Sequence, residues 1–134
     1  MNKSFFKNYL LTLIPFLILD AIWLGLVAPS FYKAQIGHLM AVNPNFLAAL
    51  LFYLLYVVGL VVFVTGREGT LMQTVLRGAF FGLVCYATYD LTNLATLRDW
   101  PILVTLVDLT WGTFASGLTS LSASWLIRRF RAKS

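Results

Sequence analysis

Four long apolar stretches dominate the pattern of hydrophobic and polar residues along the chain. They cover residues 9–28, 46–65, 76–97 and 102–127, and few charged side chains interrupt them. Each is at least as long as the ~20 residues that a helix needs to cross a hydrocarbon core. The pattern predicts an all-α, polytopic membrane protein whose four transmembrane helices form a bundle. We expect residues 1–134 to be a single integral membrane domain.

The first stretch has some features of a secretory signal peptide, because Lys3 and Lys7 precede it. It also carries Asp20 in its second half, however, and lacks a small-x-small cleavage site before Pro29. We therefore expect it to be a helix of the mature protein.

Composition supports the membrane assignment. Of the 134 residues, 60% are apolar and 11% are charged, whereas about a quarter of the residues in soluble domains are charged. The single cysteine, Cys85, excludes an intramolecular disulfide. We expect it to be a small buried apolar residue.

The net charge of +5 follows the expected topology and does not indicate a nucleic-acid partner. Only two of the ten basic residues, Lys33 and Arg98, fall on one side of a four-span arrangement. The other eight are Lys3, Lys7, Arg67, Arg77, Arg128, Arg129, Arg131 and Lys133. By the positive-inside rule, both termini and the middle loop are expected in the cytoplasm.

The longest expected loop is PSFYKAQIGHLMAVNPN, residues 29–45. Its aromatic and apolar content suggests that it lies on the membrane surface or folds back into it. Pro101 opens the fourth helix, a position that proline favours. Trp100 and Trp125 fit interfacial belts at opposite faces of the membrane.

Three aspartates, Asp20, Asp90 and Asp108, lie inside apolar stretches. Each is seven to nine residues from the nearest outer loop, which places it roughly 10–13 Å below the outer boundary at 1.5 Å per residue. No lysine or arginine in the expected spans lies beside them. The spacing predicts a ring of acids in one plane.

Glycine, serine and the acids fall in rows with a four-residue spacing in the third and fourth stretches. The rows are Gly78, Gly82, Tyr86 and Asp90, followed by Asn93, and Asp108, Gly112, Ser116, Ser120 and Ser124. Such rows let helices approach closely. We expect tight packing at the inner ends of these two helices and an opening around the acids.

This opening predicts a polar, aromatic-lined cavity that faces outward. Its expected ligand-binding residues are Trp23, His38, Tyr53, Tyr56, Tyr86, Asn93, Thr110 and Trp111, with His38 over the mouth. Aromatic walls with a few convergent polar groups suit a lipid-like or amphiphilic small molecule. The favoured function is binding of such a molecule, with or without its modification.

The three acids would together cost on the order of 8–10 kcal/mol in a membrane before compensation. Protonation, a bound metal or cationic ligand, or hydrogen bonds would reduce this cost. If a reaction occurs, Asp20, Asp90 and Asp108 are the candidates for acid and base roles. A divalent metal, if present, would be held by these three and His38. The sequence requires no cofactor.

Two other functions are compatible with the sequence. In a structural or accessory subunit, the acids could hold the helices together by hydrogen bonds. Such bonds between membrane helices, however, average below about 1 kcal/mol. Alternatively, the protein is similar in size to the small multidrug transporters. Like them, it has four expected helices and an acid in the first. This would make the protein a proton-coupled exporter acting as a dimer, although such transporters rely on one membrane acid. The sequence leaves a homo-oligomer open.

Four segments together resemble a family of small bacterial membrane proteins, a domain of unknown function predicted to have four helices. They are LDAIWLGLVAPSFYKAQIGHLM, NPNFLAALLFYLLY, GAFFGLVCYATYDLTNLATLRDWP and VDLTWGT. Its pattern positions match Asp20, Trp23, Tyr32, His38, Asp90, Asn93, Trp100, Asp108, Trp111 and Gly112. The resemblance implies the fold and a bacterial cytoplasmic (inner) membrane, with membrane lipids as partners. It favours a membrane-resident amphiphile as ligand and assigns no reaction.

Overall fold

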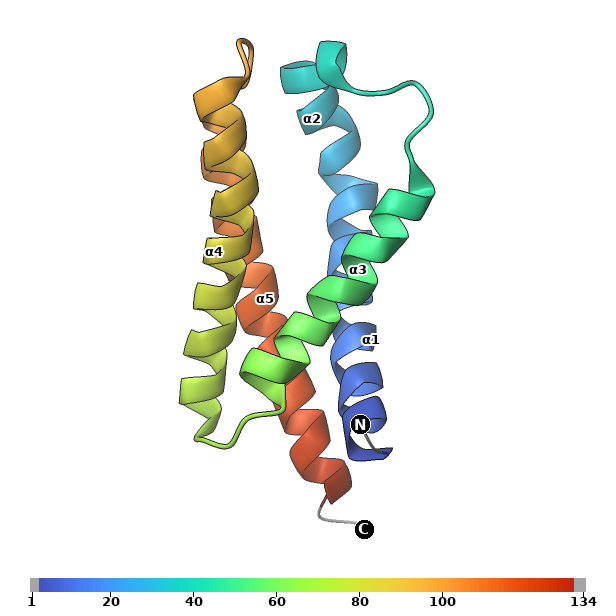
Figure 1. Ribbon diagram of the computed structural model, residues 1–134, viewed down its shortest axis with the longest axis vertical. Helices are drawn as coiled ribbons and strands as arrows, with labels where there is room; N and C mark the ends of the chain where they lie inside the picture. Colours follow the sequence, from blue (N-terminus) through green and yellow to red (C-terminus); the bar gives the residue numbers. More distant parts are fainter. Residues whose placement is uncertain (1–2, 132–134) are drawn as a thin grey trace.

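The computed structural model describes residues 3–131, and this part of the chain is helical without any strand (Figure 1). The elements are α1 (Lys3–Leu26), α2 (Ala28–Ile36), the 3-10 helix η1 (Gly37–Leu39), α3 (Phe46–Leu60), the π-helical segment η2 (Val61–Thr65), α4 (Leu71–Thr96) and α5 (Ile102–Arg131). Four segments among the described residues are long and apolar enough to cross a membrane: Ser4–Leu26, Phe46–Thr65, Leu71–Thr96 and Ile102–Arg131. The predicted all-helical fold with four candidate spans is confirmed.

Helix α4 begins five residues before the apolar stretch that predicted it. Thr70 forms a capping box, in which its hydroxyl accepts from the backbone N–H of Gln73 and the Gln73 side chain accepts from that of Thr70. These bonds satisfy backbone groups that a helix start leaves without partners. Hydropathy marks the membrane-compatible part of the helix, whereas the cap determines where the helix begins.

The helices form an antiparallel bundle in which α4 and α5 lie side by side, α1 also packs on α5, and α3 crosses at an angle (Figure 1). The Lys3 end of α1 and the Arg131 end of α5 lie at one end of the bundle, together with the loop 66–70. Helix α2 and the turn 97–101 lie at the opposite end. The orientation in a membrane stays a prediction, and Lys133 lies outside the described residues.

Glycine sets the distance between α4 and α5. A Cβ atom added to Gly82 would lie 2.2 Å from the carbonyl oxygen of Gly112, and one at Gly78 would lie 1.9 Å from the Oγ of Ser120. A Cβ on Gly112 would in turn meet the Tyr86 ring at 2.3 Å. All three distances are shorter than van der Waals contact, so any larger residue would push the helices apart. The tight packing that the small-residue rows predicted is confirmed.

Large apolar side chains cover much of the outside of the bundle. Phe46 and Leu55, both on α3, are 76% and 72% exposed. Soluble monomers rarely expose such extended apolar surface, which fits a protein surrounded by lipid. Inside, Phe16 of α1 packs with Tyr56 and other residues of α3 and η2, and the Thr12 and Thr65 hydroxyls bond at 2.9 Å.

The segment expected to be a long loop is partly helical. Residues 28–36 form α2, which follows α1 almost without interruption and has Pro29 in its first turn, where proline costs no hydrogen bond. Ile36 packs with Trp100 and Val104, so α2 folds back onto the bundle.

The expectation that Trp100 belongs to an interfacial belt is wrong. Trp100 is buried, and its Nε1 donates to the Oγ1 of Thr105 at 3.1 Å. The reason is that α2 covers this end of the bundle and encloses the indole. Trp125, at the other end of α5, is exposed, and the guanidinium of Arg129 lies 5.5 Å from its ring centroid.

Candidate functional site

A pocket of about 490 Å³ lies between residues of α1, α2, α3, α4 and α5. It is lined by Asp20, Trp23, Leu24, Tyr32, Ile36, Phe52, Tyr53, Cys85, Tyr86, Tyr89, Trp100, Asp108 and Trp111. Eight of these thirteen side chains are aromatic, two are carboxyls, and none is lysine, arginine or histidine. The pocket is therefore an aromatic enclosure whose ionisable acids have no basic neighbour in the wall.

Asp20 joins three helices at this pocket. It is buried on α1 and accepts a hydrogen bond from the Tyr53 hydroxyl of α3. The Trp111 indole of α5 also interacts with its carboxyl. The side chain thus holds α3 and α5 beside α1 around one wall of the pocket.

A chain of two hydrogen bonds connects α1 and α2 to Asp108. The Nε1 of Trp23 on α1 donates to the Tyr32 hydroxyl of α2 at 3.2 Å, and that hydroxyl donates to Oδ1 of Asp108 on α5. An indole N–H can only donate, so the Tyr32 oxygen accepts from Trp23 and its own proton points to Asp108. The bond directions make Asp108 Oδ1 an acceptor.

Tyr32 is well suited to remain a neutral donor. Burial raises the pKa of its hydroxyl above the usual value, and the neighbouring Asp108 carboxyl raises it further. Both effects disfavour a phenolate, since it would be poorly solvated and would face another negative charge. Tyr32 therefore presents a proton to Asp108 across the physiological pH range.

Two stacked indoles line the pocket. The rings of Trp23 and Trp111 stack with centroids 4.4 Å apart and planes at 11°. Trp111 Nε1 is buried and has no partner at hydrogen-bond geometry among residues 3–131. The Trp111 indole therefore lies near the Asp20 carboxyl without forming a hydrogen bond of normal geometry.

Asp90 lies next to the pocket without lining it. The residue is completely buried on α4, and neither of its oxygens has a hydrogen-bond partner in the described part of the chain. Its carboxyl interacts with Asp108 and Trp100. A carboxylate without donors here would be poorly compensated, whereas a carboxylic acid can donate its own proton to Asp108. Asp90 and Asp108 are thus two buried carboxyls that lie close to each other on α4 and α5.

The chain matches the family described as "Predicted membrane protein (DUF2177)" over residues 5–125. It belongs to this family. The match includes every residue of the pocket wall and confirms the resemblance to an uncharacterised membrane protein family. Searches of curated proteins and of solved structures gave no match.

Six of the predicted site residues line the pocket. They are Asp20, Trp23, Tyr53, Tyr86, Asp108 and Trp111. Asp90 does not line the pocket, but its carboxyl interacts with that of Asp108. The acids do not share a single centre, since Asp20 has Tyr53 as its donor while Asp108 has Tyr32 and lies beside Asp90. Counting residues gives depth along a helix but not the direction in which each side chain points.

The other four predicted residues lie elsewhere. His38 is exposed on η1, with Nε2 3.5 Å from the Asp99 carboxylate. Tyr56 is buried in the α1–α3 core and bonds to the Ser116 hydroxyl. Asn93 is half-buried on α4 outside the wall, and its side chain interacts with Tyr89.

The described residues contain no group of three histidine, cysteine, aspartate or glutamate side chains that could hold a metal ion. Asp20, Asp90, Asp108 and His38 therefore do not come together as the suggested ligand set. The exposed position of His38, paired with Asp99, accounts for its separation from the acids.

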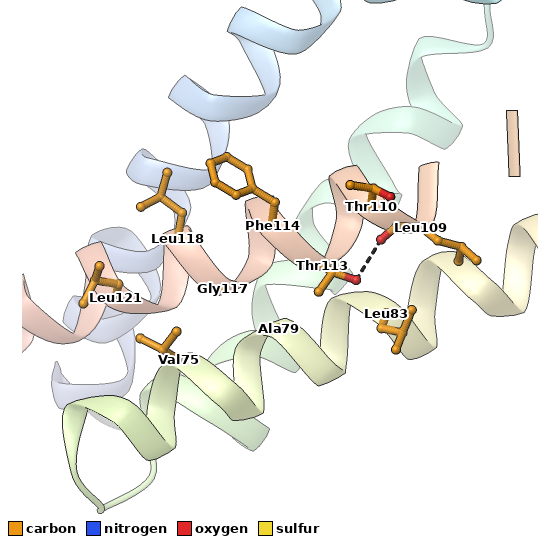
Figure 2. Close-up of a pocket in the computed structure, with 10 residues that line it drawn as sticks. All are labelled: Val75, Ala79, Leu83, Leu109, Thr110, Thr113, Phe114, Gly117, Leu118 and Leu121. Carbon is orange, nitrogen blue, oxygen red and sulfur yellow. Dashed lines mark hydrogen bonds between the residues drawn. The ribbon is translucent and has the colours of Figure 1, made fainter. Parts of the chain in front are cut away.

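Thr110 lines a different groove, of about 670 Å³, on the outside of the α4–α5 pair. Figure 2 shows it with Thr113 among apolar side chains of both helices. The hydroxyls of Thr110 and Thr113 donate to carbonyls of their own helix, those of Leu106 and Leu109, at 2.8 and 2.7 Å. This groove offers no free polar group at either threonine and contains no acid or base.

Sequence reasoning missed several residues of the wall. Leu24, Tyr32, Ile36, Phe52, Tyr89 and Trp100 were not expected to line it, and Cys85 was expected only to be a small buried residue. Tyr32 is the most consequential, because it supplies the donor to Asp108. The four-residue spacing of Tyr32 and Ile36 after a helix-compatible proline was a signal for a short helix with one inward face.

Proposed function

We propose that this protein binds a lipid-like or amphiphilic small molecule in the aromatic pocket that Asp20 and Asp108 line. The observation that carries the proposal is the wall itself, with eight aromatic side chains and two carboxyls around about 490 Å³. Small-molecule sites typically have roughly 300–1,000 Å³, largely apolar walls and a few placed polar groups. The pocket has these three properties.

The location of the acids also supports a binding function. Asp20 and Asp108 belong to helices long and apolar enough to cross a membrane, and ionisable residues in such helices mark functional sites by default because they are costly. The pocket lies near the bundle end formed by α2 and the turn 97–101. With the basic ends of α1 and α5 in the cytoplasm, this end would face outward.

Binding alone does not require a reaction. Asp20, Asp90 and Asp108 stay the candidates for acid and base roles, and the Asp90–Asp108 pair is the arrangement best suited to holding and releasing a proton. The aromatic wall would orient the ligand against Asp108 and Asp20. A reaction would then take place at one of these carboxyls.

Mass spectrometry of co-purified amphiphiles tests the binding function. We expect wild-type protein in maltoside micelles to retain specific amphiphiles, and Trp23→Ala to retain about tenfold less, since it removes a large aromatic contact. Trp125→Ala is the matched control, because Trp125 is exposed at the far end of α5. Equal retention of the same molecules by all three proteins would contradict the proposal.

A further inference from the structure

We infer that the ligand of this pocket is an amphiphile with a cationic headgroup of the quaternary-ammonium type. The inference rests on the proposed binding function and names the chemical class of its ligand. It is carried by the balance of charge in the wall and by the nature of the surfaces around it.

The charge balance of the wall is one-sided. Asp20 and Asp108 line the pocket, and no lysine, arginine or histidine does. Their donors are neutral tyrosine hydroxyls, from Tyr53 and Tyr32. The Tyr32 hydroxyl accepts from Trp23 and donates to Oδ1 of Asp108. Neutral donors compensate a buried carboxylate only in part, so a cation in the pocket would remove the remaining cost.

The aromatic surfaces beside the acids also suit a cation. The stacked Trp23 and Trp111 indoles form one wall, and the rings of Tyr53 and Tyr86 add to it. Ring faces attract cations, and aromatic enclosures are used to recognise quaternary ammonium groups. The hydroxyls of Tyr32 and Tyr53 are already engaged with the acids, which leaves the rings to contact the headgroup.

Other headgroup classes fit less well. An anionic headgroup would face two carboxyls without a basic partner. A metal ion would lack a ligand set, since the part of the chain described here brings no three suitable side chains together. A neutral amphiphile would fill the apolar volume but would not compensate the negative charge of the acids. The cationic class alone uses both the acids and the rings.

Calorimetric titration in micelles of an uncharged maltoside detergent tests the inference. The probes are decyltrimethylammonium, decanol and decanoate, which share a chain length and differ in headgroup charge. We expect wild-type protein to bind the ammonium at least about tenfold more tightly than decanol, and decanoate most weakly. Empty micelles give the blank.

Charge variants identify the source of the preference. Asp108→Asn and Asp20→Asn are each expected to lower ammonium affinity about tenfold and to leave decanol affinity within about twofold. Asp99→Asn is the matched control, because it removes one carboxylate at an exposed position paired with His38. If the asparagine variants fail to fold, Trp23→Leu, which keeps an apolar side chain but removes the ring, must reduce the ammonium preference.

The outcomes separate this inference from the proposed function. If ammonium, decanol and decanoate bind equally, or if both asparagine variants keep the ammonium preference, the cationic class is wrong while amphiphile binding stands. If none of the probes binds and no amphiphile co-purifies, the proposed function itself fails.

Discussion

At the scale of single residues, Tyr32 supplies a hydrogen bond to an acid of the pocket and also links three helices. Its hydroxyl accepts from Trp23 and donates to Asp108, so one side chain of α2 links α1 to α5. Asp90 shows the opposite situation, a buried carboxyl without a donor among the described residues. The two acids therefore differ in their surroundings: Asp108 accepts a hydrogen bond from Tyr32, and Asp90 has no hydrogen-bond partner among the described residues.

Replacing Tyr32 by phenylalanine should destabilise the bundle by about 1–3 kcal/mol. The variant removes the donor to Asp108 and leaves the Trp23 N–H without its acceptor, and unsatisfied buried polar groups cost that much. Denaturant or thermal unfolding in micelles measures the loss. Tyr9→Phe is the control, since the Tyr9 hydroxyl donates to a backbone carbonyl at an exposed position. Equal losses in the two variants would contradict the role given to Tyr32.

At the scale of elements, the α4–α5 pair is the tightest part of the bundle. The glycines of α4 face Ser116, Ser120 and the backbone of Gly112. Toward the pocket, the same rows continue with Tyr86 and Asp90 on α4 and with Asp108 on α5. One helix pair therefore combines close packing at one end with a polar site at the other. The α1 and α3 helices complete the wall with Asp20, Trp23 and Tyr53.

Gly82→Ala should destabilise the protein by about 1–3 kcal/mol, despite the higher helix propensity of alanine, because overpacking pushes the helices apart. The control is Gly117→Ala on the facing helix, where a Cβ would lie 3.4 Å from that of Ala79 and requires no large shift. We expect that variant to be neutral or up to about 1 kcal/mol more stable. Unfolding of both in the same detergent gives the comparison, and similar stability changes would refute the packing argument.

At the scale of the whole molecule, the bundle has two chemically different ends. The loop 66–70 lies at the same end as the arginine-rich end of α5, where Arg128 donates to the Gly69 carbonyl at 2.7 Å. The pocket, α2 and the His38–Asp99 pair lie toward the other end. If the basic end is cytoplasmic, the pocket lies toward the outer leaflet.

Cysteine labelling in intact cells tests this orientation. In a Cys85→Ala background, Asp99→Cys should react with a membrane-impermeant maleimide added outside, and Glu68→Cys should react only after the cells are opened. The positive-inside rule predicts this result. Both positions are exposed turn residues at opposite ends of the bundle, so each serves as the control for the other. The reverse labelling pattern would overturn the outward-facing pocket.

Much of the fold follows from the sequence because membrane helices are determined locally. A run of apolar residues long enough to cross a membrane needs no distant partner to be helical, since lipid offers no hydrogen bonds to the backbone. The close approach of α4 and α5 was likewise visible in the spacing of Gly78, Gly82 and Gly112. Six of the side chains expected at the site do line one pocket.

The tertiary structure alone decided which groups meet. The order of residues predicts similar depths for Asp20, Asp90 and Asp108. The rotation and crossing of the helices determine that Asp20 accepts a hydrogen bond from Tyr53 and Asp108 accepts one from Tyr32. The same geometry put Tyr56 in the core and buried Trp100 under α2. Hydropathy acts on each segment by itself, whereas a hydrogen bond depends on two segments far apart in the sequence. For that reason the sequence determined that buried acids exist, and only the packed bundle determined their partners.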